Sequence, residues 1–163
     1  MSASRNNQAG LTIFDTVTRH QNIAIFSELC REVDSVTDSL QDSKQKLTVL
    51  APDNDQLEKL SRKPWESSDD YSTFGADAYG GQEGTKRAHN NLRRFVQFHI
   101  IAQSPWEEGK KVQTLAGTTL VYETKSGMKW IQPGNIKVLE IMDEVSNGQV
   151  WRIDGILRDP DGH

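Results

Sequence analysis

The stretch VSNGQVWRID, residues 145–154, carries the clearest structural signal in the sequence, an Asn-Gly pair between two apolar runs. Asn and Gly tolerate the positive φ angles of a type I′ turn, so the pair predicts a tight β-hairpin centred on Asn147 and Gly148. A chain that reverses this sharply near its end is expected to finish in paired antiparallel strands.

The segments before this hairpin keep a β pattern. TTLVYET and MKWIQ, within residues 118–132, are two short strand-like runs joined by a turn-like Lys-Ser-Gly link. IKVLEIM, residues 136–142, shifts its apolar phase between Val138 and Leu139, which indicates a β-bulge or a strand covered on both faces. The second half of the chain is therefore predicted to be a β-meander.

The first half has the spacing of helices. Thr12 with Asp15 three residues later predicts a capped helix, and Asn22 is placed to cap a second one. Cys30 falls on the apolar face of that second helix, where a small buried hydrophobe is a better interpretation than a reactive thiol. The polar residues 37–46 are expected to form a loop. Helices first and a meander last predict an α+β protein.

A short buried strand and a third capped helix lie in the middle of the chain. LTVLA, residues 47–51, is a continuous apolar run that ends at Pro52. Asp53, followed by Gln56 at the third position, predicts the next helix cap. The same spacing resembles a calcium loop, but Leu57 stands where such a loop needs an oxygen ligand.

Residues 61–87 show no clean period and combine four glycines with Trp65, Tyr71, Phe74 and Tyr79. This composition predicts a long loop that packs on the body of the protein through its rings. The alternative is an aromatic binding surface for a sugar or a partner. Rings that face solvent around a cleft would favour binding, and rings buried against the helices would favour packing.

A last helix is predicted in RAHNNLRRFVQFH, residues 87–99, with His99 on its apolar face. A buried, hydrogen-bonded imidazole is favoured there over a catalytic base. Asp154, late in an apolar strand, is expected to accept backbone N–H groups rather than to act as an acid. A deep pocket that gathers Asp154, His99 and a polar nucleophile would instead indicate an enzyme.

Composition narrows the class of protein. The 163 residues, 35% hydrophobic and 26% charged, suit one globular domain, and the net charge of −4 argues against nucleic-acid binding. No apolar run is long enough to cross a bilayer. The four His residues are scattered, and no phosphate loop, nucleophile elbow or zinc spacing occurs. No catalytic residue, metal or cofactor is therefore expected.

The ends of the chain and its single cysteine are less informative. The opening residues MSASRNNQAG lack the apolar stretch of a secretory signal, which taken alone favours a cytosolic chain. One Cys allows no intrachain disulfide, so it does not indicate a redox compartment. The expected organisation is a disordered tail over residues 1–10, one domain over 11–158 and a short tail over 159–163.

Four blocks of the sequence, in order, resemble the motifs of the fasciclin domain: LTVLAPDNDQLEKL, FVQFHII, TLAG and SNGQVWRIDGIL. The second resembles the family's Tyr-His motif, with Phe98 in place of the Tyr and His99 kept. Trp151 stands where the family often has His. The segment of residues 63–100 is similar to a fungal branch with an aromatic insertion. The motif residues to which the resemblance gives a structural role are Thr48, Pro52, Asp53, Gly117, Asn147, Gly148 and Asp154.

The resemblance implies a fasciclin-like wedge, in which several short helices pack on a twisted β-sandwich or β-meander core. It also implies a non-catalytic module for cell adhesion or cell-wall and matrix association, secreted, at the cell surface or wall, or vacuolar. Its partners would be other proteins or cell-wall and matrix glycans, and a monomer is expected. The competing hypothesis is a carbohydrate or small-molecule binder that uses the aromatic loop 65–79. The candidate binding residues are Phe98, His99, Trp65, Tyr71, Phe74 and Tyr79.

Overall fold

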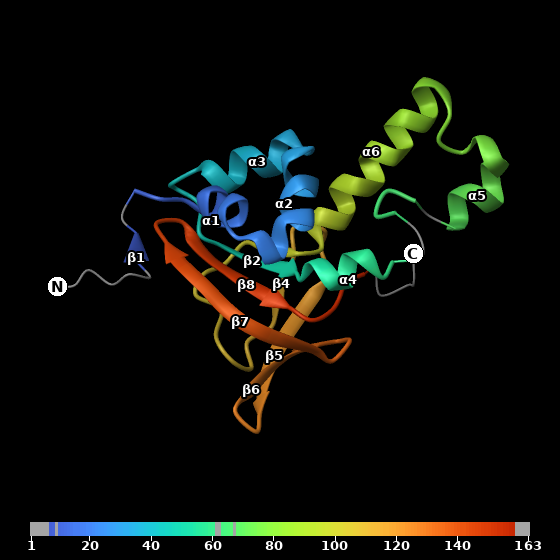
Figure 1. The fold of residues 1–163 in the computed structure, drawn as a ribbon. Helices are drawn as coiled ribbons and strands as arrows, with labels where there is room; N and C mark the ends of the chain where they lie inside the picture. The colour runs from blue at the N-terminus through green and yellow to red at the C-terminus, as the bar shows by residue number, and fades with distance from the viewer. Residues whose placement is uncertain (1–6, 9, 61–62, 67, 159–163) are drawn as a thin grey trace.

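A strongly curled β-sheet covered by helices on one side forms the body of the protein (Figure 1). The computed structural model describes residues 7–8, 10–60, 63–66 and 68–158. The helices are α1 (Ile13–Arg19), α2 (Ala24–Arg31), α3 (Asp34–Gln41), α4 (Asn54–Glu58), α5 (Ser68–Phe74) and α6 (Gly81–Gln97), with the 3-10 turns η1 (Gln21–Ile23) and η2 (Gly75–Asp77). The strands are β1 (Asn7–Gln8), β2 (Leu47–Pro52), β3 (Ile100–Ile101), β4 (Val112–Gln113), β5 (Thr119–Lys125), β6 (Met128–Gln132), β7 (Ile136–Val145) and β8 (Gly148–Ile153).

The sheet curls until its two ends almost meet. Within the described residues the strands follow the order β3-β2-β8-β7-β6-β5-β4, and β1 pairs with β7. β2 and β8 run parallel, and the other neighbours along this order are antiparallel. A bridge between Ile101 and Thr114, with a hydrogen bond of 2.8 Å from the Leu115 N–H to the Ile100 carbonyl, joins the two ends. The predicted α+β class is confirmed, and the sheet forms a near-barrel.

Two apolar clusters fill the protein, one between the helices and the sheet and one inside the curl of the sheet. In β2, Val49 and Ala51 face the helices, whereas Leu50 points into the curl. In β8, Val150 and Trp151 divide in the same way. The predicted buried strand at residues 47–51 is confirmed, and its apolar run is continuous because both of its faces are covered.

The final hairpin forms, but its turn differs from the prediction. Val145 pairs with Gly148, so Ser146 and Asn147 are the two connecting residues, and the predicted type I′ turn centred on Asn147 and Gly148 is wrong. The reason lies in close packing: a Cβ on Gly148, where φ is 144°, would lie 1.8 Å from the Leu47 carbonyl oxygen. Gly148 is required because β2 approaches it so closely.

The other β predictions hold. Lys125 pairs with Met128, and the turn between them places Ser126 at φ 54° and Gly127 at φ 79°, as a type I′ turn requires. The pairing of β7 with β8 shifts register between Val138 and Glu140, which confirms the bulge.

The N-terminal caps are partly as predicted. The Thr12 N–H donates to the Asp15 carboxylate at 2.9 Å, which confirms the first cap. Asn22, however, lies in η1, and α2 begins only at Ala24. The Ile25 N–H in the first turn of α2 donates to the Asn54 side chain at 3.0 Å. The predicted cap was wrong because the group that caps α2 comes from a distant segment.

The loops predicted at residues 37–46 and 61–87 were both wrong in part. Residues up to Gln41 belong to α3, whose Val36 and Leu40 are buried one turn apart against the other helices. The described part of residues 61–87 contains α5, η2 and the start of α6. Gly84 is required inside α6, because a Cβ at this position would lie 2.2 Å from the Tyr79 backbone.

Residues 68–90, which comprise α5, η2 and the first half of α6, project from the body as an arm (Figure 1). In the tail predicted at residues 1–10, Asn7 and Gln8 pair with β7, whereas residues 1–6 and 9 lie outside the described residues. The tail predicted at 159–163 also lies outside them. Within the part of the chain described, no helix has both the length and the apolar character needed to cross a membrane.

Candidate functional site

His99, the strongest single candidate in the sequence, is fully buried just after α6. Its Nδ1 lies 2.8 Å from the Phe95 carbonyl and its Nε2 lies 3.0 Å from the Leu157 N–H. These partners fix the tautomer, because Nδ1 must donate and Nε2 must accept. Burial lowers the pKa of His99 to about 4, so the ring is neutral near pH 7. Nδ1 thus fixes the ring to α6, and Nε2 holds the end of α6 to the segment after β8.

Asp154 lies apart from His99. It is exposed directly after β8, and its carboxylate accepts a hydrogen bond of 2.8 Å from the Gln56 side chain. Asp154 was expected to accept hydrogen bonds from backbone N–H groups, but it accepts one from the Gln56 side chain. The Gln56 side chain therefore does not complete the predicted capping box with Asp53, which caps α4 through the Asp55 N–H alone. A buried neutral imidazole and an exposed carboxylate do not form the catalytic pocket that would have indicated an enzyme. The described residues contain no cluster suited to hold a metal ion.

The remaining motif residues join elements of the fold. The Thr48 hydroxyl donates to the Gln103 carbonyl at 2.7 Å. Asp53 accepts from the Asp55 N–H at 3.1 Å and from Arg152 at 2.6 Å, and it follows Pro52 at the end of β2. Gly117, at φ 94°, donates its N–H to the Thr114 carbonyl at 2.9 Å. These contacts give each motif residue a place in the architecture.

The two positions that depart from the family pattern are both buried. Trp151 stacks on Trp106 with 5.2 Å between ring centroids and meets Tyr122 edge to face. Its indole N–H donates to the Gln149 side chain at 3.1 Å. Phe98 is 5% exposed, and the Arg94 guanidinium lies 5.1 Å above its ring. An apolar ring therefore fills space at each position where the family often has a polar one.

The four rings of the aromatic segment divide into two pairs. Trp65 packs partly buried against the helical core. The Tyr79 hydroxyl donates to Asp70 at 2.8 Å, and the Asn91 amide donates to the Trp65 carbonyl and to Asp70, both at 2.9 Å. This network ties the arm to the middle of α6.

Tyr71 and Phe74 form the second pair, and they are the exposed rings of the arm, at 37% and 49%. Tyr71 meets Tyr79 edge to face with 5.4 Å between centroids. The Arg87 guanidinium lies 3.7 Å above the Phe74 ring. The surface around Tyr71 and Phe74 therefore combines apolar rings with the positive charge of Arg87. Because Arg87 covers one face of Phe74 and Tyr71 contacts Tyr79 by its edge, the four rings do not form one open stacking platform.

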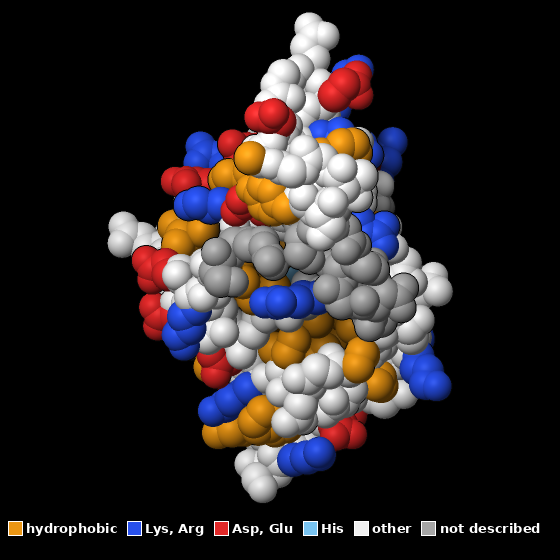
Figure 2. Space-filling model, turned by 90° about the vertical axis from the view of Figure 1, so that its right-hand side faces the viewer, with side chains coloured by type: hydrophobic (Ala, Val, Ile, Leu, Met, Phe, Trp, Pro, Cys, Tyr) orange, Lys and Arg blue, Asp and Glu red, His pale blue; other side chains and the backbone are white. Residues whose placement is uncertain are grey.

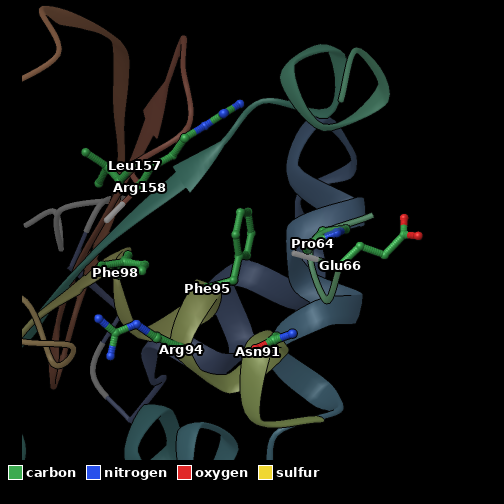
Figure 3. A pocket seen from close by; sticks show the side chains of 8 residues that line it. All are labelled: Pro64, Glu66, Asn91, Arg94, Phe95, Phe98, Leu157 and Arg158. Carbon is green, nitrogen blue, oxygen red and sulfur yellow. The ribbon is translucent and has the colours of Figure 1, made fainter. Parts of the chain in front are cut away.

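A cleft of about 190 Å³ lies beside the second half of α6, next to Phe98. Figure 3 shows Phe98, just after α6, below Leu157, with the ring of Phe95 standing beside them and the Arg94 and Arg158 side chains extending away from each other. Viewed from the side of α5 and α6, hydrophobic side chains reach the surface next to Lys and Arg side chains (Figure 2). The sequence did not predict this cleft, because nothing in its local pattern relates residue 94 to residue 158.

The chain is similar in sequence to fasciclin-domain proteins of fungi. The family model for the fasciclin domain matches residues 21–159. A FAS1 domain-containing protein of Neurospora crassa is 43% identical over 94% of this chain and 68% of its own length. Similar proteins of Aspergillus fumigatus and Emericella nidulans are 41% and 44% identical over 96% and 90% of this chain. The chain spans 67% and 61% of their lengths.

Among solved structures, a FAS1 domain pair from the insect cell adhesion molecule fasciclin I matches with a TM-score of 0.66. The match covers 94% of this chain and 53% of that chain at 13% sequence identity. Since the identity is so low, this likeness concerns the fold alone.

Proposed function

Because the chain belongs to the fasciclin domain family, we propose that it is a non-catalytic interaction domain that attaches to cell-wall or extracellular-matrix components. The observation that carries this proposal is the projecting arm with Tyr71 and Phe74 exposed on α5. Large exposed rings are typical of binding surfaces, and Tyr and Arg are enriched among the residues that dominate binding energy. Arg87, stacked on Phe74, adds such a cation to the same surface.

A protein partner suits this surface better than a glycan. Sugars bind by stacking flat on an open aromatic face. Arg87 already covers one face of Phe74, and Tyr71 is in edge contact with Tyr79. A surface that combines apolar edges with a guanidinium resembles the centre of a protein interface. We therefore propose a protein partner, and the experiment below also tests the alternative that residues 65–79 bind a carbohydrate.

We place the domain outside the cytosol, at the cell surface, in the cell wall or in the vacuole, and we expect it to be a monomer. The support is membership of the family and the fungal origin of the similar proteins. A single monomeric domain with one small arm would bind weakly, and several copies on a wall would gain strength through avidity.

Co-sedimentation with purified cell walls of a filamentous fungus tests the proposal. The variant Tyr71→Ala with Phe74→Ala is expected to bind about thirtyfold more weakly, because exposed rings contribute on the order of 1 kcal/mol each to such interfaces. Its melting temperature should fall only slightly, because the contacts that these rings make lie on the surface of the arm. Protease treatment of the walls should abolish binding, and glucanase treatment should leave it.

Met128→Ala is the matched control, since Met128 is 44% exposed at the tip of the β5–β6 hairpin, away from the arm. It should bind like the wild type. If binding survives protease and disappears after glucanase, the partner is a glycan and the alternative holds. Equal binding by the arm variant and the wild type would rule out the arm.

A further inference from the structure

A row of three side chains crosses the outer face of the curled sheet at Trp130. Glu123 on β5 and Lys137 on β7 are the residues paired with Trp130 on the two neighbouring strands. Paired residues lie on the same face of a sheet, with about 5 Å between their Cβ atoms. The adjacent pair, Tyr122 with Ile131, points into the curl of the sheet. Glu123, Trp130 and Lys137, which we call the Trp130 row, therefore face outward.

No described helix covers this row. The helices lie over β2 and β8, whereas the β5–β6 hairpin extends away from them (Figure 1). Trp130 is half-buried and belongs to neither apolar cluster, and the same holds for Val121, diagonal to it on β5. Within the described residues the Trp130 indole N–H has no hydrogen-bond acceptor, and it is not sealed from water. A large ring that adds nothing to the core is typical of a binding surface.

The groups beside the ring offer both a hydrogen-bond donor and an acceptor. The Lys137 ammonium has no ion pair within the described part of the chain. The Glu123 carboxylate lies 2.9 Å from Lys125, and the hydrogen bond from Lys125 lowers the pKa of Glu123, so the group is ionised at neutral pH. A carboxylate accepts several hydrogen bonds, so one cation does not exhaust it. The row thus joins a flat apolar ring to polar groups of both kinds.

This combination suits a neutral sugar better than a protein. Charged side chains are depleted at the centre of protein interfaces, because burying them away from water is costly. In the Trp130 row, Glu123 and Lys137 stand directly beside the ring on either side. Sugar hydroxyls both donate and accept, so they satisfy both groups while the C–H face of the sugar packs on the indole. β-Linked glucose, whose ring substituents are all equatorial, presents such a C–H face.

We propose that the Trp130 row binds a chain of β-linked glucose residues. One pyranose ring lies flat on Trp130, and its hydroxyls accept from Lys137 and donate to Glu123. The β5–β6 hairpin and the arm project from opposite ends of the molecule (Figure 1), so this site does not depend on the proposed attachment through the arm. One stacked ring gives a Kd of roughly 1 mM, which is too weak to hold the domain on protease-treated walls by itself.

The test is titration of the full chain with cellotetraose, a soluble β-linked glucose oligomer, followed through indole and amide chemical shifts. The Trp130 indole N–H signal, identified by its absence from Trp130→Tyr, is expected to move together with amide signals of β5 and β6. Trp130→Tyr keeps a flat ring and should bind about twofold more weakly, whereas Trp130→Leu should bind at least about tenfold more weakly. Both variants should keep the melting temperature, because Trp130 lies outside both apolar clusters.

Lys137→Met should weaken binding about threefold, because it removes a hydrogen-bond donor beside the ring. Lys86→Met is the matched control, since Lys86 is exposed on α6 and not on this sheet; it should bind like the wild type. The arm variant should also bind cellotetraose normally, which separates this site from the exposed rings of the arm.

The proposal is wrong if cellotetraose moves no signals at millimolar concentration, if Trp130→Leu binds like Trp130→Tyr, or if the signals that move belong to α5. It is also wrong if the free domain dimerises and Trp130→Leu makes it monomeric, because this face then joins two copies of the chain. Maltotetraose, the α-linked isomer, should bind more weakly, because its axial linkages turn the neighbouring sugars away from a flat sheet. Equal binding by maltotetraose would contradict the choice of a β-linked chain.

Discussion

His99 shows how a residue with catalytic potential can serve the fold instead. Both ring nitrogens are hydrogen-bonded to backbone groups, and the rings of Phe26 and Phe95 lie 5.5 and 4.9 Å away. Protonation would place a charge in this apolar site and would turn Nε2 from an acceptor into a donor facing the Leu157 N–H. The residue therefore stabilises the protein only while it is neutral.

The stability of the protein should consequently fall in acid. The folded pKa of His99, about 4, lies below its ordinary value of 6.5, so the unfolded chain binds the proton more readily. Its contribution is fully present above pH 6.5 and is lost as the pH falls toward 4. The shift corresponds to about 3 kcal/mol.

Urea denaturation of the wild type and of His99→Phe, at several pH values between 7.5 and 4, measures this loss. The variant should be less stable at pH 7.5 but should lose about 3 kcal/mol less on acidification, because the other titrating groups are shared. Parallel stability curves for the two proteins would show that His99 is not the group responsible.

The single cysteine is a buried apolar residue, as the sequence predicted. Cys30 is fully buried in the helical cluster, and burial raises the pKa of its thiol far above the ordinary value. An apolar face at helical spacing was sufficient to predict this. The Leu157 partner of His99 was not predictable, because Leu157 lies on another segment that only the fold brings close.

At the scale of elements, Asn147 joins three segments that are far apart in the sequence. Its side chain accepts from the Ile13 N–H at 2.8 Å and donates to the carbonyls of Leu40 and Asp42 at 2.8 and 3.1 Å. Its own carbonyl accepts from the Leu47 N–H at 2.9 Å. One buried amide thus fixes the start of α1, the end of α3 and the entry to β2 against the last hairpin.

Asn147→Ala is expected to destabilise the protein by at least about 3 kcal/mol, since it leaves several buried backbone groups without partners at roughly 1–3 kcal/mol each. Urea denaturation at pH 7.5 measures the change. Asn22→Ala is the control, because Asn22 is exposed in η1 and caps no helix; its effect should stay within about 0.5 kcal/mol. A loss below 1 kcal/mol in the Asn147 variant would contradict this role.

The elements that were predicted correctly have local signals. The β5–β6 hairpin, the bulge in β7 and the Asp53 cap each depend on neighbouring residues. The elements that were missed depend on distant ones. α3 buries only Val36 and Leu40 and is stabilised by its contacts with α1 and α2, and α2 receives its cap from Asn54. The Asn-Gly hairpin was predicted with the wrong turn, because contacts outside the hairpin determine the backbone conformations of Asn147 and Gly148.

At the scale of the whole molecule, the polar motif residues and the exposed rings occupy different regions. Asn147, His99 and Thr48 lie inside the body and bind backbone groups. Tyr71 and Phe74 lie on the arm, away from both apolar clusters. The sequence predicted the class of fold from its ordered motifs. It did not predict the arm, because residues 61–87 have no clean helical period and their helices depend on contacts such as those of Asp70 and Asn91.

Hydrogen exchange of the domain, free and bound to fungal cell walls, tests most directly the claim that the residues that stabilise the fold are separate from those that bind. Exchange in α5 and the first half of α6 should slow on binding, whereas the peptides that contain His99 and Asn147 should be unchanged. Protection confined to the β5–β6 hairpin or to the cleft beside Phe98, with α5 unaffected, would contradict the claim.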